Sequence, residues 1–159
     1  MAGSTVVLAP ELEVSEWVGT PTPLSSLRGR VVMIEAFQIL CPGCIAYGLP
    51  QARKVQRMFP DVTVVGLNTV FEHHEVTGPD ALRVFLAEYG YTFPVAFDRP
   101  GEGPLPLTMQ RYGLQGTPST VLIDKSGTAR FSHLGAIDDL ALGMMLGRLV
   151  AEESPETVP

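Results

Sequence analysis

A short apolar segment, residues 31–37, is the feature that most restricts how this chain can fold. The segment is too short for a helix, is rich in β-branched residues and does not alternate between polar and apolar positions. This pattern is typical of a strand buried on both faces of a sheet. Glu35 is its one charged residue and places a carboxyl group in the middle of the strand. The chain therefore needs covering elements on both sides of this strand.

Alternating strands and helices are predicted along the rest of the chain. Further strands are expected at residues 62–67, 93–97, 119–123 and 128–134, and helices at residues 42–59, 79–89, 108–112 and 137–150. Residues 124–127 carry a hairpin signal between the last two strands. Met144 and Met145 are expected to fill the core from the last helix. This order predicts an α/β fold, a central mixed sheet with helices on both faces, and site chemistry at the carboxyl ends of its parallel strands.

Composition limits the domain count and the classes of partner. The 159 residues are 45% hydrophobic and 18% charged, which suits one domain with a sizeable core. We expect an N-terminal arm at residues 1–30, a folded domain at residues 31–151 and a flexible tail at residues 152–159. The net charge is −6 without a basic cluster, which disfavours nucleic acid and anionic membranes as partners. The apolar stretches are too short to span a membrane.

The first ten residues bear on the cellular compartment. Residues 1–10 lack the basic and apolar regions of a secretory signal. As given, the chain is predicted to be cytoplasmic, and the alternative is a periplasmic or secreted mature form whose leader has been removed. Two cysteines do not decide between these compartments, because a Cys-x-x-Cys pair functions in either one.

The two cysteines of the chain lie three residues apart in Cys41-Pro42-Gly43-Cys44, at the start of a predicted helix. Thiol–disulfide exchange needs an attacking thiolate and a second thiol that resolves the mixed disulfide. A helix N-terminus stabilises a thiolate, so Cys41 is predicted to attack, and the more buried Cys44 to resolve. Pro42 suits a first helical turn, and Gly43 leaves space for a docking partner. A Cys41–Cys44 disulfide is predicted for the oxidised state.

An inert buried pair and a metal site are the alternatives for these cysteines. A zinc site would need two further ligands from His73, His74 or His133, and the chain has no second cysteine pair. We therefore predict no metal. His73 and His74 follow the second predicted strand and could shuttle protons or contact a substrate. The alternative interpretation of these two histidines is a solvated polar loop.

Two more segments carry candidate site residues. Glu35 precedes Cys41 by six positions and is expected beneath the cysteines, where burial should raise its pKa and let it exchange a proton with Cys44. The alternative is a carboxylate that pairs with an arginine or reaches solvent. Pro118 enters a strand after Thr117 and is a candidate cis peptide, although a trans turn is more frequent for such a sequence. The Thr117 backbone could then pair with an extended substrate segment.

Several motifs together resemble the thioredoxin superfamily, most closely the TlpA/ResA-like thiol-disulfide oxidoreductases, over residues 24–135. The motifs are Leu27-Arg28-Gly29-Arg30-Val31-Val32, Phe37 with Cys41-Pro42-Gly43-Cys44, Gly116-Thr117-Pro118-Ser119, and Leu122-Ile123-Asp124 with Gly127. The resemblance implies a thioredoxin-like fold and a cis Pro118 opposite the cysteines. It also places Glu35 where thioredoxins carry a buried aspartate.

The chain departs from the pattern of this superfamily at two positions. Leu40 replaces the usual tryptophan before the first cysteine, which alters the surface that meets partners. Pro50, the counterpart of a helix-kinking proline, comes one residue later than usual. This shift predicts a local bulge or a changed register in the helix that follows the cysteines.

The predicted function is exchange of disulfides with protein thiols and disulfides through a mixed disulfide at Cys41, driven by an upstream reductant or oxidant. We expect a monomer without a bound cofactor. The first alternative is a peroxidase of the peroxiredoxin type, but Phe37 and Cys41 occupy the positions where that family needs proline and threonine or serine before its cysteine, here Cys44. The second alternative is a thioredoxin-fold binding module without turnover.

Overall fold

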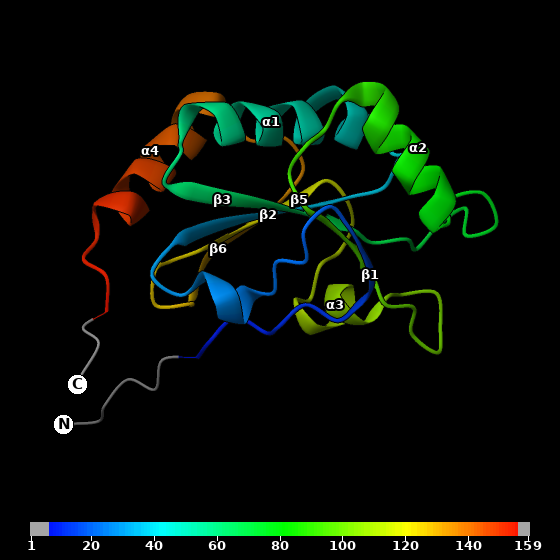
Figure 1. Ribbon diagram of the computed structural model, residues 1–159, viewed down its shortest axis with the longest axis horizontal. Coiled ribbons are helices and arrows are strands. Elements are labelled where there is room, and N and C mark those ends of the chain that lie inside the picture. Colours follow the sequence, from blue (N-terminus) through cyan, green and yellow to red (C-terminus); the bar gives the residue numbers. More distant parts are fainter. Residues whose placement is uncertain (1–6, 156–159) are drawn as a thin grey trace.

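The computed structural model describes residues 7–155 and shows a six-stranded mixed sheet between two layers of helices (Figure 1). The strands lie in the order β1-β4-β3-β2-β5-β6. Their bounds are β1 Val14–Val18, β2 Val31–Phe37, β3 Val62–Asn68, β4 Val95–Asp98, β5 Ser119–Ile123 and β6 Ala129–Leu134. The helices are the 3-10 turn η1 Leu24–Leu27, the π-helical turn η2 Cys44–Gly48, α1 Leu49–Met58, α2 Pro79–Tyr89, α3 Leu107–Arg111 and α4 Asp139–Ala151.

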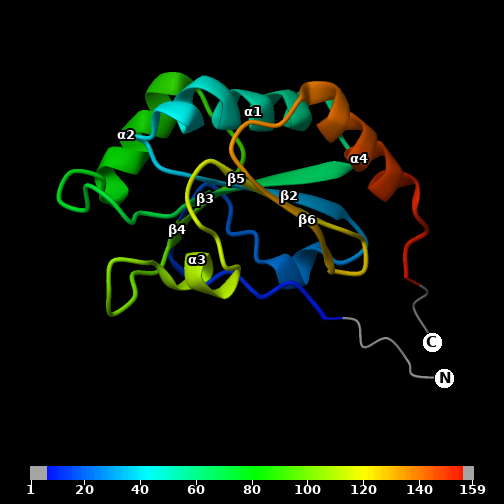
Figure 2. The same ribbon diagram turned by 180° about the vertical axis from the view of Figure 1, so that it is seen from behind.

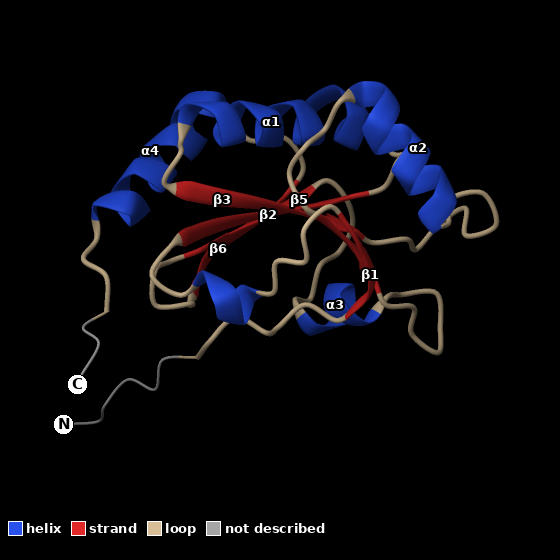
Figure 3. Cartoon of the chain, in the orientation of Figure 1, coloured by secondary structure: helices blue, strands red, loops and turns tan. Residues whose placement is uncertain are grey.

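Helices cover both faces of this sheet, as the order of elements predicts. The helices α1, α2 and α4 lie on one face, and α3 and the short turn η1 lie on the other (Figures 1 and 2). Strand β2 runs parallel to β3 and antiparallel to β5. Figure 3 shows the strands as one layer between the helices. The predicted α/β thioredoxin-like fold is therefore confirmed.

Strand β2 supplies side chains to two separate cores. Met33 and Phe37 pack with residues of α1, α2 and α4, whereas Val32 and Ile34 pack on the opposite face with residues that include Met109 of α3. All seven residues of β2 are buried. Each fully buried aliphatic or aromatic side chain contributes roughly 1.5–3 kcal/mol to folding, so this strand is the centre of the domain. The predicted N-terminal arm includes residues 1–6, and the predicted flexible tail includes residues 156–159. Both of these stretches lie outside the described residues.

Two of the predicted boundaries begin two residues later in the structure, each for a local reason. The strand expected at residues 93–97 is Val95–Asp98, because Pro94 has no N–H for a ladder bond and contributes only its carbonyl, to the N–H of Gly66 at 2.9 Å. The last helix begins at Asp139 because Asp138 is its N-cap. The Asp138 carboxylate accepts bonds from the two backbone N–H groups of residues 140 and 141, at 3.0 and 3.1 Å.

The prediction that Met144 fills the core is wrong. Helix α4 buries Leu142, Leu146 and Leu149, which follow each other along one face of the helix. Met144 lies two positions from both Leu142 and Leu146, on the opposite side of the helix, and is 55% exposed. Met145 is partly buried and packs against the core.

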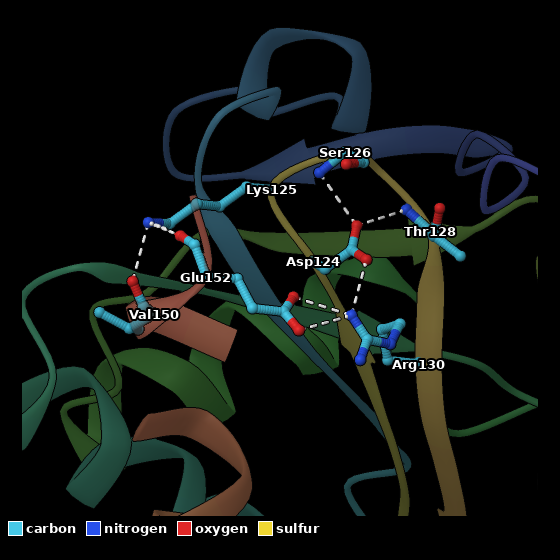
Figure 4. Close-up of polar contacts among 7 residues, drawn as sticks. All are labelled: Asp124, Lys125, Ser126, Thr128, Arg130, Val150 and Glu152. Atoms are coloured by element: carbon cyan, nitrogen blue, oxygen red, sulfur yellow. Dashed lines mark hydrogen bonds and ion pairs between the residues drawn. The ribbon is translucent and has the colours of Figure 1, made fainter. Parts of the chain in front are cut away.

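A polar clasp ties the β5–β6 hairpin to the end of α4 (Figure 4). The Lys125 ammonium donates to the carbonyl oxygens of Val150 and Glu152, both at 2.8 Å. The Arg130 guanidinium lies between the carboxylates of Asp124 and Glu152, at 3.1 and 2.8 Å. The two bonds from Lys125 give partners to carbonyl groups at the end of α4. The last carbonyl groups of a helix have no hydrogen-bond partner within the helix itself.

Candidate active site

The two cysteines lie where β2 ends and the helical layer begins. Cys41 is partly exposed, and Cys44 is fully buried in the first position of η2. The backbone N–H of Cys44 points at the Cys41 sulfur at 3.4 Å, so the two residues face each other as free thiols. The N–H of Ile45 donates to the Cys41 carbonyl at 3.1 Å. One sulfur is therefore accessible and the other lies behind it.

The loop at Thr117 and Pro118 faces these cysteines from the start of β5. The Thr117–Pro118 peptide bond is cis, as the resemblance implies. The Cys41 thiol lies 3.5 Å from the carbonyl oxygen of Thr117. A Cβ atom added to Gly43 would lie 3.1 Å from Cδ of Pro118, so the glycine allows the close approach of the two loops. The structure thus brings Cys41, Gly43, Thr117 and Pro118 together.

Glu35 is buried in β2, beneath the turn that carries the cysteines, and is 1% exposed. Its Oε2 accepts a bond from the Thr120 hydroxyl at 2.7 Å, while its Oε1 has no hydrogen-bond partner among the described residues. Burial raises the pKa of this carboxyl well above its ordinary value of 4.5, and the bond from Thr120 opposes that rise only in part. Among the described residues, Glu35 has no arginine partner, and its side chain does not reach solvent. The alternative prediction, a carboxylate that pairs with an arginine or reaches solvent, is therefore excluded.

The helix after the cysteines has the changed register that the position of Pro50 predicts. Its first turn, η2, is π-helical, and α1 follows with Pro50 in its own first turn. This register places Gly48 against Glu35 and Pro118. A Cβ atom on Gly48 would lie 2.6 Å from Oε1 of Glu35 and 2.8 Å from Cβ of Pro118. The extra residue therefore puts a glycine where the helix, the buried carboxyl and the cis proline meet.

The Cys44 thiol is held in its protonated form by its surroundings. Burial is the largest cause that raises its pKa, and the contact with Cys41 raises it further. The backbone N–H of Gln38 and the hydroxyl of Thr117 act in the opposite direction, because both can donate a hydrogen bond to the sulfur. A thiol in this environment needs a proton acceptor before it can attack.

Comparison with known proteins shows the family to which the chain belongs. The chain matches the Redoxin family over residues 3–141. It belongs to the Redoxin family. The solved structure of a thioredoxin-like superfamily protein is 49% identical, with a TM-score of 0.91 over 93% of this chain and 99% of that one. A thiol-disulfide isomerase from Corynebacterium glutamicum is also 49% identical, with a TM-score of 0.87 over 91% of this chain and 97% of its own.

A curated relative is the thiol-disulfide oxidoreductase ResA of Bacillus thuringiensis, which is 25% identical over 119 residues. That match covers 75% of this chain and 63% of the relative, so the chain spans less than two thirds of the length of ResA. Family, fold and relatives together identify this Redoxin-family protein as a thiol-disulfide oxidoreductase of the thioredoxin superfamily, similar to the TlpA and ResA proteins.

Two of the histidines of this Redoxin-family protein, His73 and His74, are exposed in the loop between β3 and α2. The His74 ring lies 3.2 Å from the carbonyl oxygen of Pro104, in the loop after β4. The His73 carbonyl accepts a bond from the Thr77 hydroxyl at 2.8 Å. Neither imidazole contacts a cysteine in the described part of the chain, so a role in proton transfer or substrate contact stays a prediction.

Gln38 was not among the predicted site residues, and the structure places it beside the Thr117 loop. Gln38 is 4% exposed, and its amide contacts both the Thr117 hydroxyl and the backbone at the start of the histidine loop. A polar residue next to the end of a fully buried strand was the available signal. Within residues 7–155, no group of three or more His, Cys, Asp and Glu side chains could hold a metal ion. No described helix is long and apolar enough to cross a membrane.

Proposed function

We propose that this protein exchanges disulfides with protein partners through Cys41 and Cys44, with a mixed disulfide at Cys41 as the intermediate. The observation that carries this proposal is the arrangement of the two sulfurs. Cys41 is accessible and lies 3.5 Å from the Thr117 carbonyl oxygen, while Cys44 is buried with its N–H 3.4 Å from the Cys41 sulfur. A partner can therefore reach the Cys41 sulfur, and the Cys44 sulfur lies behind it, where it can attack the mixed disulfide and release the partner.

In the reducing direction, the Cys41 thiolate attacks one sulfur of the partner's disulfide. That bond breaks, the Cys41–partner disulfide forms, and the second partner sulfur leaves as a thiolate that takes a proton from water. The ionised Glu35 then accepts the proton of Cys44, directly or through water, and the Cys44 thiolate attacks the Cys41 sulfur. The partner leaves fully reduced and the protein holds a Cys41–Cys44 disulfide. An upstream dithiol reduces this disulfide, and Glu35 returns the proton to Cys44.

The surface around Cys41 supports a partner in extended conformation. The Thr117 backbone, next to the cis proline, can pair with a partner strand as a short addition of β-structure. Pro42 and Gly43 present no long side chain beside the attacking sulfur. Leu40 is 54% exposed next to Cys41 and offers an apolar contact where the superfamily usually has tryptophan.

Reduction of insulin by the protein with a dithiol tests the proposal. Cys41→Ser should abolish activity, and Cys44→Ser should accumulate the mixed disulfide, whose captured partners mass spectrometry can name. Full activity of Cys41→Ser would refute the proposal. Consumption of hydrogen peroxide is measured in parallel, because rapid peroxide turnover without disulfide reduction would establish the peroxidase alternative. Inactivity in both assays, with thiols that alkylate no faster than free cysteine, would indicate a binding module.

The compartment and the oligomeric state belong to the same proposal. We propose a monomer without a cofactor, in the cytoplasm or as a mature form beyond the cytoplasmic membrane. Light scattering measures the mass of the protein in solution, and fractionation of the source cells determines the compartment.

A further inference from the structure

The carboxyl group of Glu35 has one oxygen with a hydrogen-bond partner and one without. Its Oε2 accepts a bond of 2.7 Å from the hydroxyl of Thr120, which is 2% exposed. Its Oε1 is also buried and has no partner among the described residues. Thr120 lies opposite Glu35 where β2 pairs with β5, so the ladder of the sheet holds the two side chains side by side. None of the roles above uses the Thr120 hydroxyl.

The two oxygens of Glu35 face different elements. Oε2 meets β5 through Thr120. Oε1 lies against η2, the turn that begins at Cys44, because a Cβ atom added to Gly48 of that turn would lie 2.6 Å from it. The same Cβ atom would lie 2.8 Å from Cβ of Pro118. The oxygen without a partner is therefore the one on the side of the cysteines and the cis proline.

The bond from Thr120 decides which oxygen of Glu35 carries the proton. The Thr120 hydroxyl has a single hydrogen, and Oε2 is its one acceptor among the described residues. In a neutral carboxyl group the carbonyl oxygen is the better acceptor, so Oε2 is the carbonyl oxygen and the proton lies on Oε1. The bond becomes stronger when the carboxyl group ionises. It therefore favours the ionised form and leaves Oε1 available for proton exchange.

We propose that Thr120 is a positioning residue for the resolving step, whose hydroxyl holds Oε2 of Glu35 so that Oε1 takes the proton of Cys44 and later returns it. This inference rests on the proposed proton exchange between Glu35 and Cys44. The proton moves from the Cys44 sulfur to Oε1, directly or through water, as Cys44 attacks the mixed disulfide. It moves back when the Cys41–Cys44 disulfide is reduced. No covalent bond forms or breaks at Thr120.

Few other titratable groups lie on the elements that pack against Glu35. The strands β2, β3 and β5 contain no second titratable side chain. The turn η2 contributes the buried Cys44 thiol and Tyr47, which is 62% exposed. The charged side chains of α1 and α4 lie at half-buried or exposed positions and are those of Arg53, Lys54, Arg57, Asp139 and Arg148. A pH profile that moves when Thr120 is changed therefore reports on Glu35, the group that its hydroxyl contacts.

Substitutions at Thr120 separate the hydroxyl from the volume of the side chain. Thr120→Val removes the hydroxyl at nearly constant volume, and Thr120→Ser keeps it. Thr69→Val is the matched control, because Thr69 is also fully buried and donates to a buried carboxylate, Oδ2 of Asp98, at 3.0 Å. The readout is release of thionitrobenzoate from a mixed disulfide preformed on Cys41, a single-turnover measure of attack by Cys44.

Thr120→Val should slow release about tenfold at pH 7, the equivalent of one lost hydrogen bond to a charged group. Because the loss lowers the ionised fraction of Glu35, the pH profile should move to higher pH, and the limiting rate at high pH should stay the same. A carboxyl group that was merely misplaced would lower the rate equally at every pH, and that result would overturn the inference. Thr120→Ser and Thr69→Val should keep the wild-type profile. Thr120→Val should add nothing in a Glu35→Gln background, because Thr120 acts through Glu35.

Infrared spectroscopy tests which oxygen carries the proton. At pH 5 burial keeps Glu35 neutral, and its carbonyl stretch is the band that Glu35→Gln removes. This band should move to higher frequency in Thr120→Val, because the carbonyl oxygen Oε2 loses its hydrogen bond. It should not move in Thr69→Val.

A pH profile of Thr120→Val that is unchanged or moves to lower pH would overturn the inference, and so would a carbonyl band that stays in place. Thr120→Ala provides the same measurements if valine prevents folding. Retained insulin reduction by Cys41→Ser refutes the proposed function itself. Release by Glu35→Gln at the wild-type rate refutes the role of Glu35 and this inference with it. A wild-type profile of Thr120→Val, with Cys41→Ser inactive and Glu35→Gln slow, refutes the role of Thr120 alone.

Discussion

Glu35 links the chemistry of the site to the stability of the fold. Because burial raises its pKa in the folded state, the unfolded chain loses this proton first as the pH rises. The free energy of unfolding should therefore fall from about pH 4.5 upward, by at most about 1.4 kcal/mol per pH unit for this one proton, until the pH passes the pKa of the folded state. Glu35→Gln should remove this fall. Urea unfolding of both proteins between pH 5 and 9 measures it, and parallel curves would contradict the prediction.

The same substitution should slow the enzyme. Because Glu35 is the proton acceptor that we propose for the Cys44 thiol, resolution of the mixed disulfide should slow by about 10²-fold at neutral pH, within the usual range for a general base. The deficit should narrow at high pH, where Cys44 ionises without help. Single-turnover release from Cys41 across the pH range measures this, and an unchanged rate at pH 7 would remove Glu35 from the mechanism.

At the scale of elements, the π-helical turn η2 depends on a glycine. A Cβ atom on Gly48 would lie 2.6 Å from the Glu35 carboxyl and 2.8 Å from Pro118, distances that force one of them to move. Gly48→Ala should therefore lower the free energy of unfolding by about 1–3 kcal/mol. Gly147→Ala in α4 is the control, because the added methyl group meets open space and should raise the free energy of unfolding by about 1 kcal/mol. Urea unfolding distinguishes the two, and equal stabilisation would contradict this view of the turn.

The helices show which features of an element can be predicted from the local sequence. The helix α2 begins and ends as its pattern predicts, at Pro79 and Tyr89, although Tyr89 itself is 59% exposed. The shifted Pro50 was sufficient to predict the changed register after the cysteines. The exposure of Met144 was not predictable in this way, because it depends on which face of α4 meets the sheet.

At the scale of the whole molecule, the polar clasp holds the last helix to the last hairpin. Lys125 satisfies two carbonyl groups at the end of α4, both at 2.8 Å. Lys125→Met should lower the free energy of unfolding by about 1 kcal/mol, the usual contribution of a lost hydrogen bond. Arg130→Met is the comparison, because Arg130 and its partner Glu152 are both substantially exposed and only its partner Asp124 is buried, so the effect should be smaller and should shrink in 1 M salt. Equal and salt-sensitive losses in both variants would show that the clasp acts through charge alone.

The local pattern of residues was sufficient to determine much of this protein. The continuous strand at residues 31–37 predicted a sheet covered on both faces, and the cysteine pair after it predicted where the chemistry lies. The buried carboxyl group of Glu35 could also be predicted, because it interrupts an apolar strand six residues before Cys41. The significance of Pro50 came from the resemblance to the thioredoxin superfamily, in which the matching proline comes one residue earlier.

Only the tertiary structure decided what surrounds the sulfurs. Thr117 is 76 residues from Cys41 and 79 from Gln38, yet its carbonyl faces one and its hydroxyl the other. Such contacts depend on the antiparallel pairing of β2 with β5 and on its register, which places Glu35 opposite Thr120. Local periodicity reports which side of a strand is buried, but it holds no information about which distant strand lies beside it. The contact between Gln38 and Thr117 could therefore be seen only once the sheet was assembled.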